Sequence, residues 1–261
     1  MKSLRKYGGP LFRLAVIHGG PGAAGGTASV ARTLSNNYGV LEPLQTVDSL
    51  EGQIAELKSV LEDDSNLPII LIGFSWGAWL SYIFTARYPD LVKKLILISS
   101  GPFEEKYALG INEVRMRRLS EEERIEVNSL YRKFNDSRIE VKDKVFQRFG
   151  EIFSKADTFN SIDDDSDKII YDFKIFQNVW KEAAEMRKNG SLLEFGKQIK
   201  CPVIAIHGDY DPHPPNGVKY PLSKMLNDFR FVLLKNCGHK PWIEKQAKDK
   251  FYKILKSEII Q

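Results

Sequence analysis

Six short runs of apolar residues recur along this chain of 261 residues, with helical patterns between most of them. The runs are continuous rather than alternating, which is typical of strands buried on both faces of a parallel sheet. They lie at residues 14–17, 39–44, 69–72, 95–99, 203–206 and 230–234. The helical patterns lie at about residues 27–35, 50–62, 76–87, 219–227 and 242–258. This alternation predicts an α/β fold with a doubly wound, mostly parallel sheet.

A long block interrupts the alternation between the fourth and the fifth run. Residues 103 to about 195 are charged and rich in helical patterns, and they contain no convincing strand. We therefore predict a core formed by residues 1–102 and 196–261, and a helical cap, or lid, formed by residues 103–195.

Local signals within this block indicate where its helices begin and end. Ser120 and Glu123 have the spacing of a capping box, and Asn189-Gly190 is a helix stop after the pattern of residues 174–188. The run Asp163-Asp164-Asp165 predicts a solvated loop.

Most aromatic side chains of the block are expected to form its own core, and about one in four to face a pocket. The aromatic residues considered are Phe134, Phe146, Phe149, Phe153, Phe159, Tyr171, Phe173, Phe176 and Trp180.

A serine lies where the third apolar run meets a helical pattern. In Gly73-Phe74-Ser75-Trp76-Gly77, the two glycines remove the Cβ atoms that would clash where a strand turns sharply into a helix. Such a turn strains the backbone of the serine and lifts its Oγ clear of the sheet. Ser75 is therefore predicted to be a nucleophile.

Candidates for a base and an orienting acid follow the last two strands. In an architecture of this kind the acid precedes the histidine along the chain. Asp209 and Asp211 follow the run at residues 203–206, and His239 follows the run at residues 230–234. Both positions lie just past the end of a strand, at the edge of the sheet where sites are built. His239 is predicted to be the general base, and the two aspartates compete for the orienting role.

A glycine-rich loop, His18-Gly19-Gly20-Pro21-Gly22, follows the first run. Such a loop can direct backbone N–H groups at an anion, which in acyl transfer is the tetrahedral oxyanion. We assign this role to the amides of Gly20 and Trp76. A phosphate-binding loop is the alternative, but the chain lacks the glycine and lysine spacing of that motif. His18 is expected to fix the loop by hydrogen bonds, and His207 and His213 to be structural or to line a pocket.

Together these segments resemble the α/β-hydrolase fold superfamily in its serine-nucleophile branch. The segments His18-Gly19-Gly20-Pro21-Gly22 and Ser75-Trp76-Gly77 look most like those of proline iminopeptidases and related esterases. The resemblance covers residues 11–102 and about 196–261. It implies a triad of Ser75, His239 and Asp211, because it places the acid three residues after the glycine that ends the strand, here Gly208.

Two departures from that family pattern bear on the prediction. Proline iminopeptidases usually carry an Asp-x-Arg-Gly segment after the next strand, and here residues 40–46 lead almost directly to a helix near Ser49. The chain ahead of His18 is also short for the antiparallel strands that normally come first. We therefore expect an abbreviated sheet at the N-terminal end.

The predicted reaction is hydrolysis of a small-molecule carboxylic ester, or of a thioester or amide, through an acyl-enzyme. The alternative is an aminopeptidase like proline iminopeptidase, for which Glu182 and Glu185 are candidates to hold the substrate ammonium. A non-catalytic ligand-binding protein on the same fold is the alternative from another class.

Composition limits the partners of such a protein. The formal net charge is +4, and the basic residues form no clustered face, so we expect no nucleic acid partner. No segment resembles a signal peptide, and no run approaches the ~18 apolar residues of a membrane span, so we expect a cytoplasmic protein without a membrane partner.

Cys201 and Cys237 are predicted to be free thiols. No cofactor is needed, and the histidine and cysteine spacings support no metal site. The oligomeric state is left open.

Overall fold

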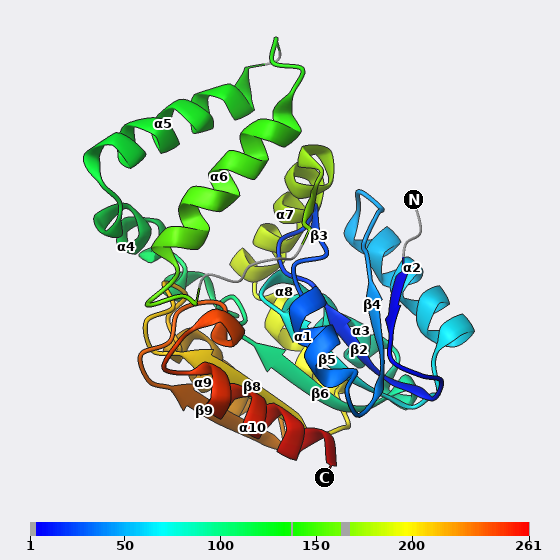
Figure 1. Ribbon diagram of the computed structural model, residues 1–261. Helices are drawn as coiled ribbons and strands as arrows, with labels where there is room; N and C mark the ends of the chain where they lie inside the picture. Colours follow the sequence, from blue (N-terminus) through cyan, green and yellow to red (C-terminus); the bar gives the residue numbers. More distant parts are fainter. Residues whose placement is uncertain (1–3, 137, 163–167, 261) are drawn as a thin grey trace.

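The computed structural model describes residues 4–136, 138–162 and 168–260 of the chain. Its centre is a sheet of seven strands in the order β1-β4-β2-β5-β6-β8-β9 (Figure 1). These strands are β1 (Leu4–Tyr7), β2 (Phe12–Ile17), β4 (Gly39–Pro43), β5 (Ile69–Phe74), β6 (Val92–Ile98), β8 (Val203–Gly208) and β9 (Phe229–Leu234). β1 pairs with β4 in the antiparallel sense, and the other pairings of this sheet are parallel. The predicted α/β class and mostly parallel sheet are confirmed.

Helices cover both faces of the sheet. One face packs against α1 (Ala28–Leu34) and α10 (Lys248–Ile260). The other packs against α2 (Leu50–Asp64), α3 (Trp76–Arg87) and α9 (Asn216–Met225). Successive residues of a strand face opposite sides. In β5, for example, Ile70 and Ile72 pack in the apolar cluster on the side of α1 and α10. Ile69 and Leu71 pack in the cluster on the side of α2, α3 and α9. Burial on both faces explains why the runs are continuous.

The segment between β6 and β8 adds mainly helices. They are α4 (Ile111–Arg118), α5 (Glu121–Asn135), α6 (Lys142–Ala156), α7 (Phe173–Lys188) and α8 (Ser191–Glu194). In Figure 1, α4, α5 and α6 extend away from the sheet. The capping box of Ser120 and Glu123 begins α5, and Gly190, with a φ of 82°, follows the end of α7, as predicted. The faces of α5 and α6 that meet share an apolar cluster of their own, separate from the two clusters of the sheet.

The structure differs from the prediction in three places. β1 was not predicted because its residues, Leu-Arg-Lys-Tyr, form no apolar run, as is common for an edge strand. The block at residues 103–195 does contain a strand, β7 (Ile170–Tyr171), which pairs with β3 (Ala23–Ala24) over only two residues, too few to give a pattern. The helix predicted at residues 242–258 begins instead at Lys248, because Pro241 opens a short 3-10 turn first.

Among the described residues, β1 is the one antiparallel strand ahead of β2, which agrees with the abbreviated sheet expected at this end. The solvated loop predicted at residues 163–165 lies outside the described residues. Within the part of the chain that the structure describes, no helix combines the length and the apolar character needed to cross a bilayer.

Candidate active site

Ser75 lies in the tight turn between β5 and α3. Its φ of 52° and ψ of −114° fall in a region that residues other than glycine rarely adopt, so the turn holds backbone strain. A Cβ atom at Gly73 would overlap the carbonyl oxygen of Gly77, and one at Gly77 would overlap the carbonyl oxygen of Ile17. The two glycines therefore let β5, α3 and the end of β2 approach one another, as the sequence predicted.

Two other loops bring His239 and Asp211 to this serine. The Nε2 atom of His239, after β9, lies 3.0 Å from the Oγ atom of Ser75. The Nδ1 atom of the same ring lies 2.7 Å from Oδ2 of Asp211, after β8. Because an ionised carboxylate only accepts hydrogen bonds, Nδ1 carries the ring proton and Nε2 is left to accept the proton of the serine hydroxyl. The three predicted side chains thus form one continuous hydrogen-bonded chain.

Asp209, the rival for the orienting role, faces elsewhere. Its Oδ1 accepts a hydrogen bond of 3.3 Å from the backbone N–H of Cys237, and its Oδ2 lies 3.5 Å from Nζ of Lys235. This carboxylate ties the turn after β8 to the loop that leads to His239. Of the two aspartates, Asp211 is the one in contact with the imidazole.

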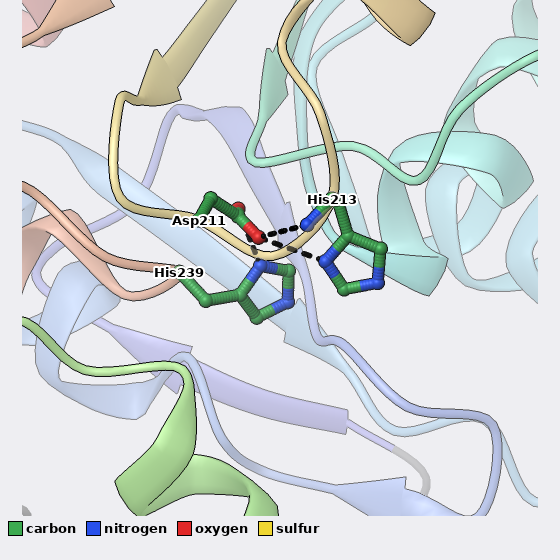
Figure 2. A group of neighbouring side chains, drawn as sticks. All are labelled: Asp211, His213 and His239. Carbon is green, nitrogen blue, oxygen red and sulfur yellow. Dashed lines mark hydrogen bonds and ion pairs between the residues drawn. The ribbon is translucent and has the colours of Figure 1, made fainter. Parts of the chain in front are cut away.

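Two further histidines, His207 and His213, surround Asp211. The sequence predicted only that they are structural or line a pocket. Oδ1 of Asp211 accepts hydrogen bonds from Nδ1 of His213 at 2.8 Å and from the backbone N–H of His213 at 2.9 Å. Figure 2 shows the rings of His213 and His239 converging on the carboxylate from two loops. His207 donates from Nε2 to the carbonyl oxygen of His213 at 2.8 Å, and the same Nε2 lies 3.6 Å from Oδ2 of Asp211. His207 and His213 therefore hold the acid loop in place.

Burial and charge set the protonation of this group. Burial alone raises the pKa of Asp211, but the neighbouring His239, His213 and His207 outweigh it and hold this pKa well below its usual range. Burial lowers the pKa of His213 to about 4 and also lowers the pKa of His207, against the attraction of Asp211. At neutral pH the cluster is thus a carboxylate with two neutral structural imidazoles beside the ring of His239.

His18 fixes the glycine-rich loop, as expected. Its Nδ1 donates to the carbonyl oxygen of Gly19 at 3.0 Å, and its Nε2 accepts from the backbone N–H of Gln45 at 3.3 Å. The ring is fully buried, and burial lowers its pKa to about 4, so a neutral imidazole joins Gly19 to Gln45.

Gly20, one of the two predicted oxyanion donors, has a φ of 64° and lines the same cavity as Ser75. Trp76 opens α3, where the first amides have no partner within the helix. Trp76 thus follows Ser75 directly in the chain, and Gly20 lines the same cavity; the oxyanion role of their amides stays a prediction.

Glu244 is a site residue that the sequence reasoning missed. It is fully buried, and its carboxylate accepts three backbone hydrogen bonds, from Gly238 and Phe159 at 2.9 Å and from Asn160 at 2.8 Å. It therefore joins the loop that carries His239 to the segment after α6. No spacing or motif signals this role, because all its partners are backbone groups.

We expect replacement of Glu244 by alanine to lower the free energy of unfolding by about 3 kcal/mol, since three amides lose a charged acceptor. Urea denaturation measures this change. Glu56→Ala is the matched control, because Glu56 is only half-buried and also accepts from a backbone N–H, that of Thr46, in a hydrogen bond exposed to solvent. A loss at Glu244 no larger than that at Glu56 contradicts the proposed role of the carboxylate.

The two cysteines are free, as predicted. Burial raises the pKa of Cys201 to about 11 and raises the pKa of Cys237 as well. A thiol held in its neutral form is a poor nucleophile. Cys237, although only two residues from His239, therefore does not compete with Ser75.

A cavity of about 830 Å³ opens over Ser75 and His239. One wall comes from the glycine-rich loop, and the opposite wall from α6 and the segments on either side of β7. Six of the nine aromatic residues considered in the sequence line it, more than expected, because one face of α6 serves both as helix core and as cavity wall. They are Phe146, Phe149, Phe153, Phe159, Tyr171 and Phe176.

Charged groups near the cavity floor are paired. Asp157 accepts two hydrogen bonds from the guanidinium of Arg115, at 2.7 and 2.5 Å. Its backbone carbonyl accepts from the N–H of His239 at 2.8 Å. The ion pair therefore links α4 and the end of α6 to the histidine loop. Sequence reasoning treated the basic residues around Arg115 as a solvated face, because no local pattern indicates a partner 42 residues away.

The α/β-hydrolase fold family model matches residues 54–246 of the chain. The protein therefore belongs to the α/β-hydrolase fold family, as the strand order and the serine turn also indicate. No curated protein matches the chain by sequence.

Several solved structures share the fold. The crystal structure of VinJ has 18% sequence identity to this chain and a TM-score of 0.67, over 98% of this chain and 93% of that chain. A putative lipase from Acinetobacter baumannii AYE is 18% identical, with a TM-score of 0.64 over 99% of this chain and 88% of that chain. A monoacylglycerol lipase from Paleococcus ferrophilus is 16% identical, with a TM-score of 0.62 over 98% of this chain and 97% of that chain. At these identities the similarity is one of fold.

Proposed function

We propose that this protein is a serine hydrolase that cleaves a carboxylic ester of an elongated apolar acid through an acyl-enzyme. One observation carries the proposal. The Oγ atom of Ser75, the ring of His239 and the carboxylate of Asp211 are joined by contacts of 3.0 and 2.7 Å beside a large cavity. That arrangement makes a serine hydroxyl nucleophilic.

In the proposed mechanism, Ser75 attacks the ester carbonyl while Nε2 of His239 takes the hydroxyl proton. Asp211 holds the ring in the required tautomer and stabilises its charged form. The amides of Gly20 and Trp76 stabilise the oxyanion of the tetrahedral intermediate. The imidazolium then protonates the departing alcohol, and water activated by the same ring hydrolyses the acyl-enzyme. A thioester or an amide of the same acid would follow the same steps.

The shape of the cavity supports an elongated acyl group. Phe146, Phe149, Gly150 and Phe153 line it from one face of α6, at spacings of three and four residues. With a rise of 1.5 Å per residue, this stripe is about 10 Å long. Its aromatic surface suits a hydrocarbon chain, and the carboxylate of Asp157 in the cavity lining is paired with Arg115.

The aminopeptidase alternative receives less support. Glu182 accepts a hydrogen bond of 3.1 Å from the backbone N–H of Leu50, and neither Glu182 nor Glu185 is among the described residues that line the cavity. The carboxylates that do line it are those of Glu151 and Asp157, and Glu151 accepts from Gln147 at 3.0 Å. A substrate ammonium would have to compete with these existing partners.

We also propose that residues 103–195 act as the cap of this hydrolase, over a core of residues 1–102 and 196–261. The contribution of α6 to the cavity wall supports that division.

Labelling with a fluorophosphonate tests the nucleophile directly. We expect one adduct, mapped to Ser75 by mass spectrometry of peptides, and none in the Ser75→Ala variant. Folded protein that stays unlabelled would favour the non-catalytic ligand-binding alternative on the same fold.

Gly150 offers a test of the acyl pocket. A Cβ atom there would lie 3.5 Å from the Tyr171 ring, an ordinary contact, so packing does not require the glycine and Gly150→Ala should fit. Gly150→Leu instead places a branched side chain in the cavity. We expect it to lower kcat/KM for dodecanoyl and octanoyl esters by about tenfold or more, the range for blocked apolar contacts, and to spare acetyl esters. A p-nitrophenyl ester series measures this.

Gly150→Ala is the matched control, and it should also stabilise α6 by roughly 0.8 kcal/mol through helix propensity. If Gly150→Leu lowers the rates for all chain lengths alike, the acyl chain does not follow α6.

A further inference from the structure

The cluster around Asp211 contains an imidazole, that of His213, that contacts the carboxylate directly and that the proposed mechanism does not use. Nδ1 of His239 and Nδ1 of His213 both face the same carboxylate, at 2.7 and 2.8 Å from its two oxygens. The two rings lie 4.6 Å apart between centroids and are tilted by 30°. Figure 2 shows that the two rings stand on separate loops and converge on this carboxylate.

We propose that Asp211, His213 and His239 form a binding site for a zinc-type divalent ion, and that occupancy inactivates the enzyme. Each residue offers one ligand atom, and these three atoms lie within 4.8 Å of one another. Two imidazole nitrogens and one carboxylate oxygen are a set that Zn²⁺ takes at open sites, with the fourth position left to water. Mg²⁺ and Ca²⁺ prefer oxygen ligands, so the site discriminates against them.

The fit requires the three side chains to shift. Zn–N and Zn–O bonds of about 2.0–2.2 Å at tetrahedral angles separate the ligand atoms by roughly 3.3 Å. The separations of 2.7 Å from Oδ2 to Nδ1 of His239 and of 2.8 Å from Oδ1 to Nδ1 of His213 would widen by about half an ångström, and a ligand pair at the outer limit of 4.8 Å would close by about 1.5 Å. The side chains of His213 and His239 are 12% and 11% exposed, so the ion has a route from solvent to the buried carboxylate.

Binding at this position would reverse the tautomer that catalysis needs. A metal ion takes the lone pair of Nδ1, so the proton that Nδ1 carried moves through solvent to Nε2 of the same ring, which stays neutral. On His239, that Nε2 is the atom 3.0 Å from Oγ of Ser75. Once protonated it donates instead of accepting, and it can no longer take the hydroxyl proton. The inhibition rests on the proposed function, whereas the binding does not.

Isothermal titration of tag-free protein with ZnCl₂ tests the binding. We expect one equivalent to bind the wild type, MgCl₂ to give no heat, and His213→Asn to bind zinc about tenfold or more weakly, the scale for loss of a supporting group at a metal site. Asparagine keeps a donor toward Asp211 but removes the imidazole. His213→Ala serves as a second variant if the first does not fold, as judged by thermal melting. Wild type that binds no zinc, or variants that bind it equally well, overturn the site.

Ester hydrolysis tests the inhibition separately. Zinc at the concentration that halves wild-type turnover should leave the turnover of His213→Asn, relative to its own metal-free rate, nearly unchanged, and EDTA should restore the wild type. Zinc that binds without slowing turnover overturns the inactivation. If metal-free wild type cleaves no ester, the proposed function fails while the titration still decides the site.

Discussion

Replacement of Ser75 by alanine should lower kcat by about three to six orders of magnitude, the range measured for members of such triads. The variant loses the only atom that forms the covalent bond in the proposed mechanism. His239 and the oxyanion amides remain, so a small residual rate above that in buffer is expected. Steady-state hydrolysis of the best ester in the chain-length series measures both quantities.

Two observations separate this loss from a folding defect. The alanine variant should melt at nearly the same temperature as the wild type, because alanine keeps the Cβ atom, and with it the strain at a φ of 52°, and loses only the 3.0 Å contact with His239. Ser154→Ala is the matched control, since this serine also lines the cavity but lies on α6 and has no contact with His239 among the described residues. Comparable loss in the two variants would mean that Ser75 is not the nucleophile.

Local signals in the sequence account for most of the sheet. Continuous apolar runs such as residues 69–72 are typical of strands buried on both faces of a parallel sheet, and the structure confirms all six runs as strands. β1 was not predicted because it is an edge strand and its charged residues Arg5 and Lys6 interrupt any apolar run. The β3–β7 pairing was not predicted because two residues in each strand are too few to show an alternating or apolar pattern in the sequence.

The nucleophile turn was predictable because the residues it needs lie close together in the sequence. Gly73 and Gly77 stand within five residues, so a short motif records them, although the backbone that Gly77 lets approach is that of Ile17 at the end of β2. His239 and Asp211 were predictable from chain order and from their positions after strands. The contacts of Glu244 and the pairing of Arg115 with Asp157 depend on how segments after α6 fold back on the histidine loop. No pattern within one segment encodes that.

Asparagine at position 211 is expected to lower kcat by about four orders of magnitude with little change in KM. The amide of Asn can present N–H to Nδ1 of His239, at the place where Oδ2 now accepts at 2.7 Å. The ring then holds its proton on Nε2 and cannot act as a base toward Ser75. The variant also lacks the charge that stabilises the imidazolium. Binding of substrate is unaffected because Asp211 is buried behind His239, so the split between kcat and KM identifies an orienting acid.

Asp209→Asn is the matched control, two residues away in the same loop. Its carbonyl oxygen can still accept from the backbone N–H of Cys237, as Oδ1 of Asp209 does at 3.3 Å, so turnover should fall only slightly. The loss at position 211 should also persist at every pH, because the wrong tautomer does not depend on a titration in the working range. Equal damage from the two substitutions would reverse the assignment and make Asp209 the orienting acid. A full rate in Asp211→Asn would instead require that His239 is held by the backbone alone, through the N–H that it donates to the carbonyl oxygen of Asp157 at 2.8 Å.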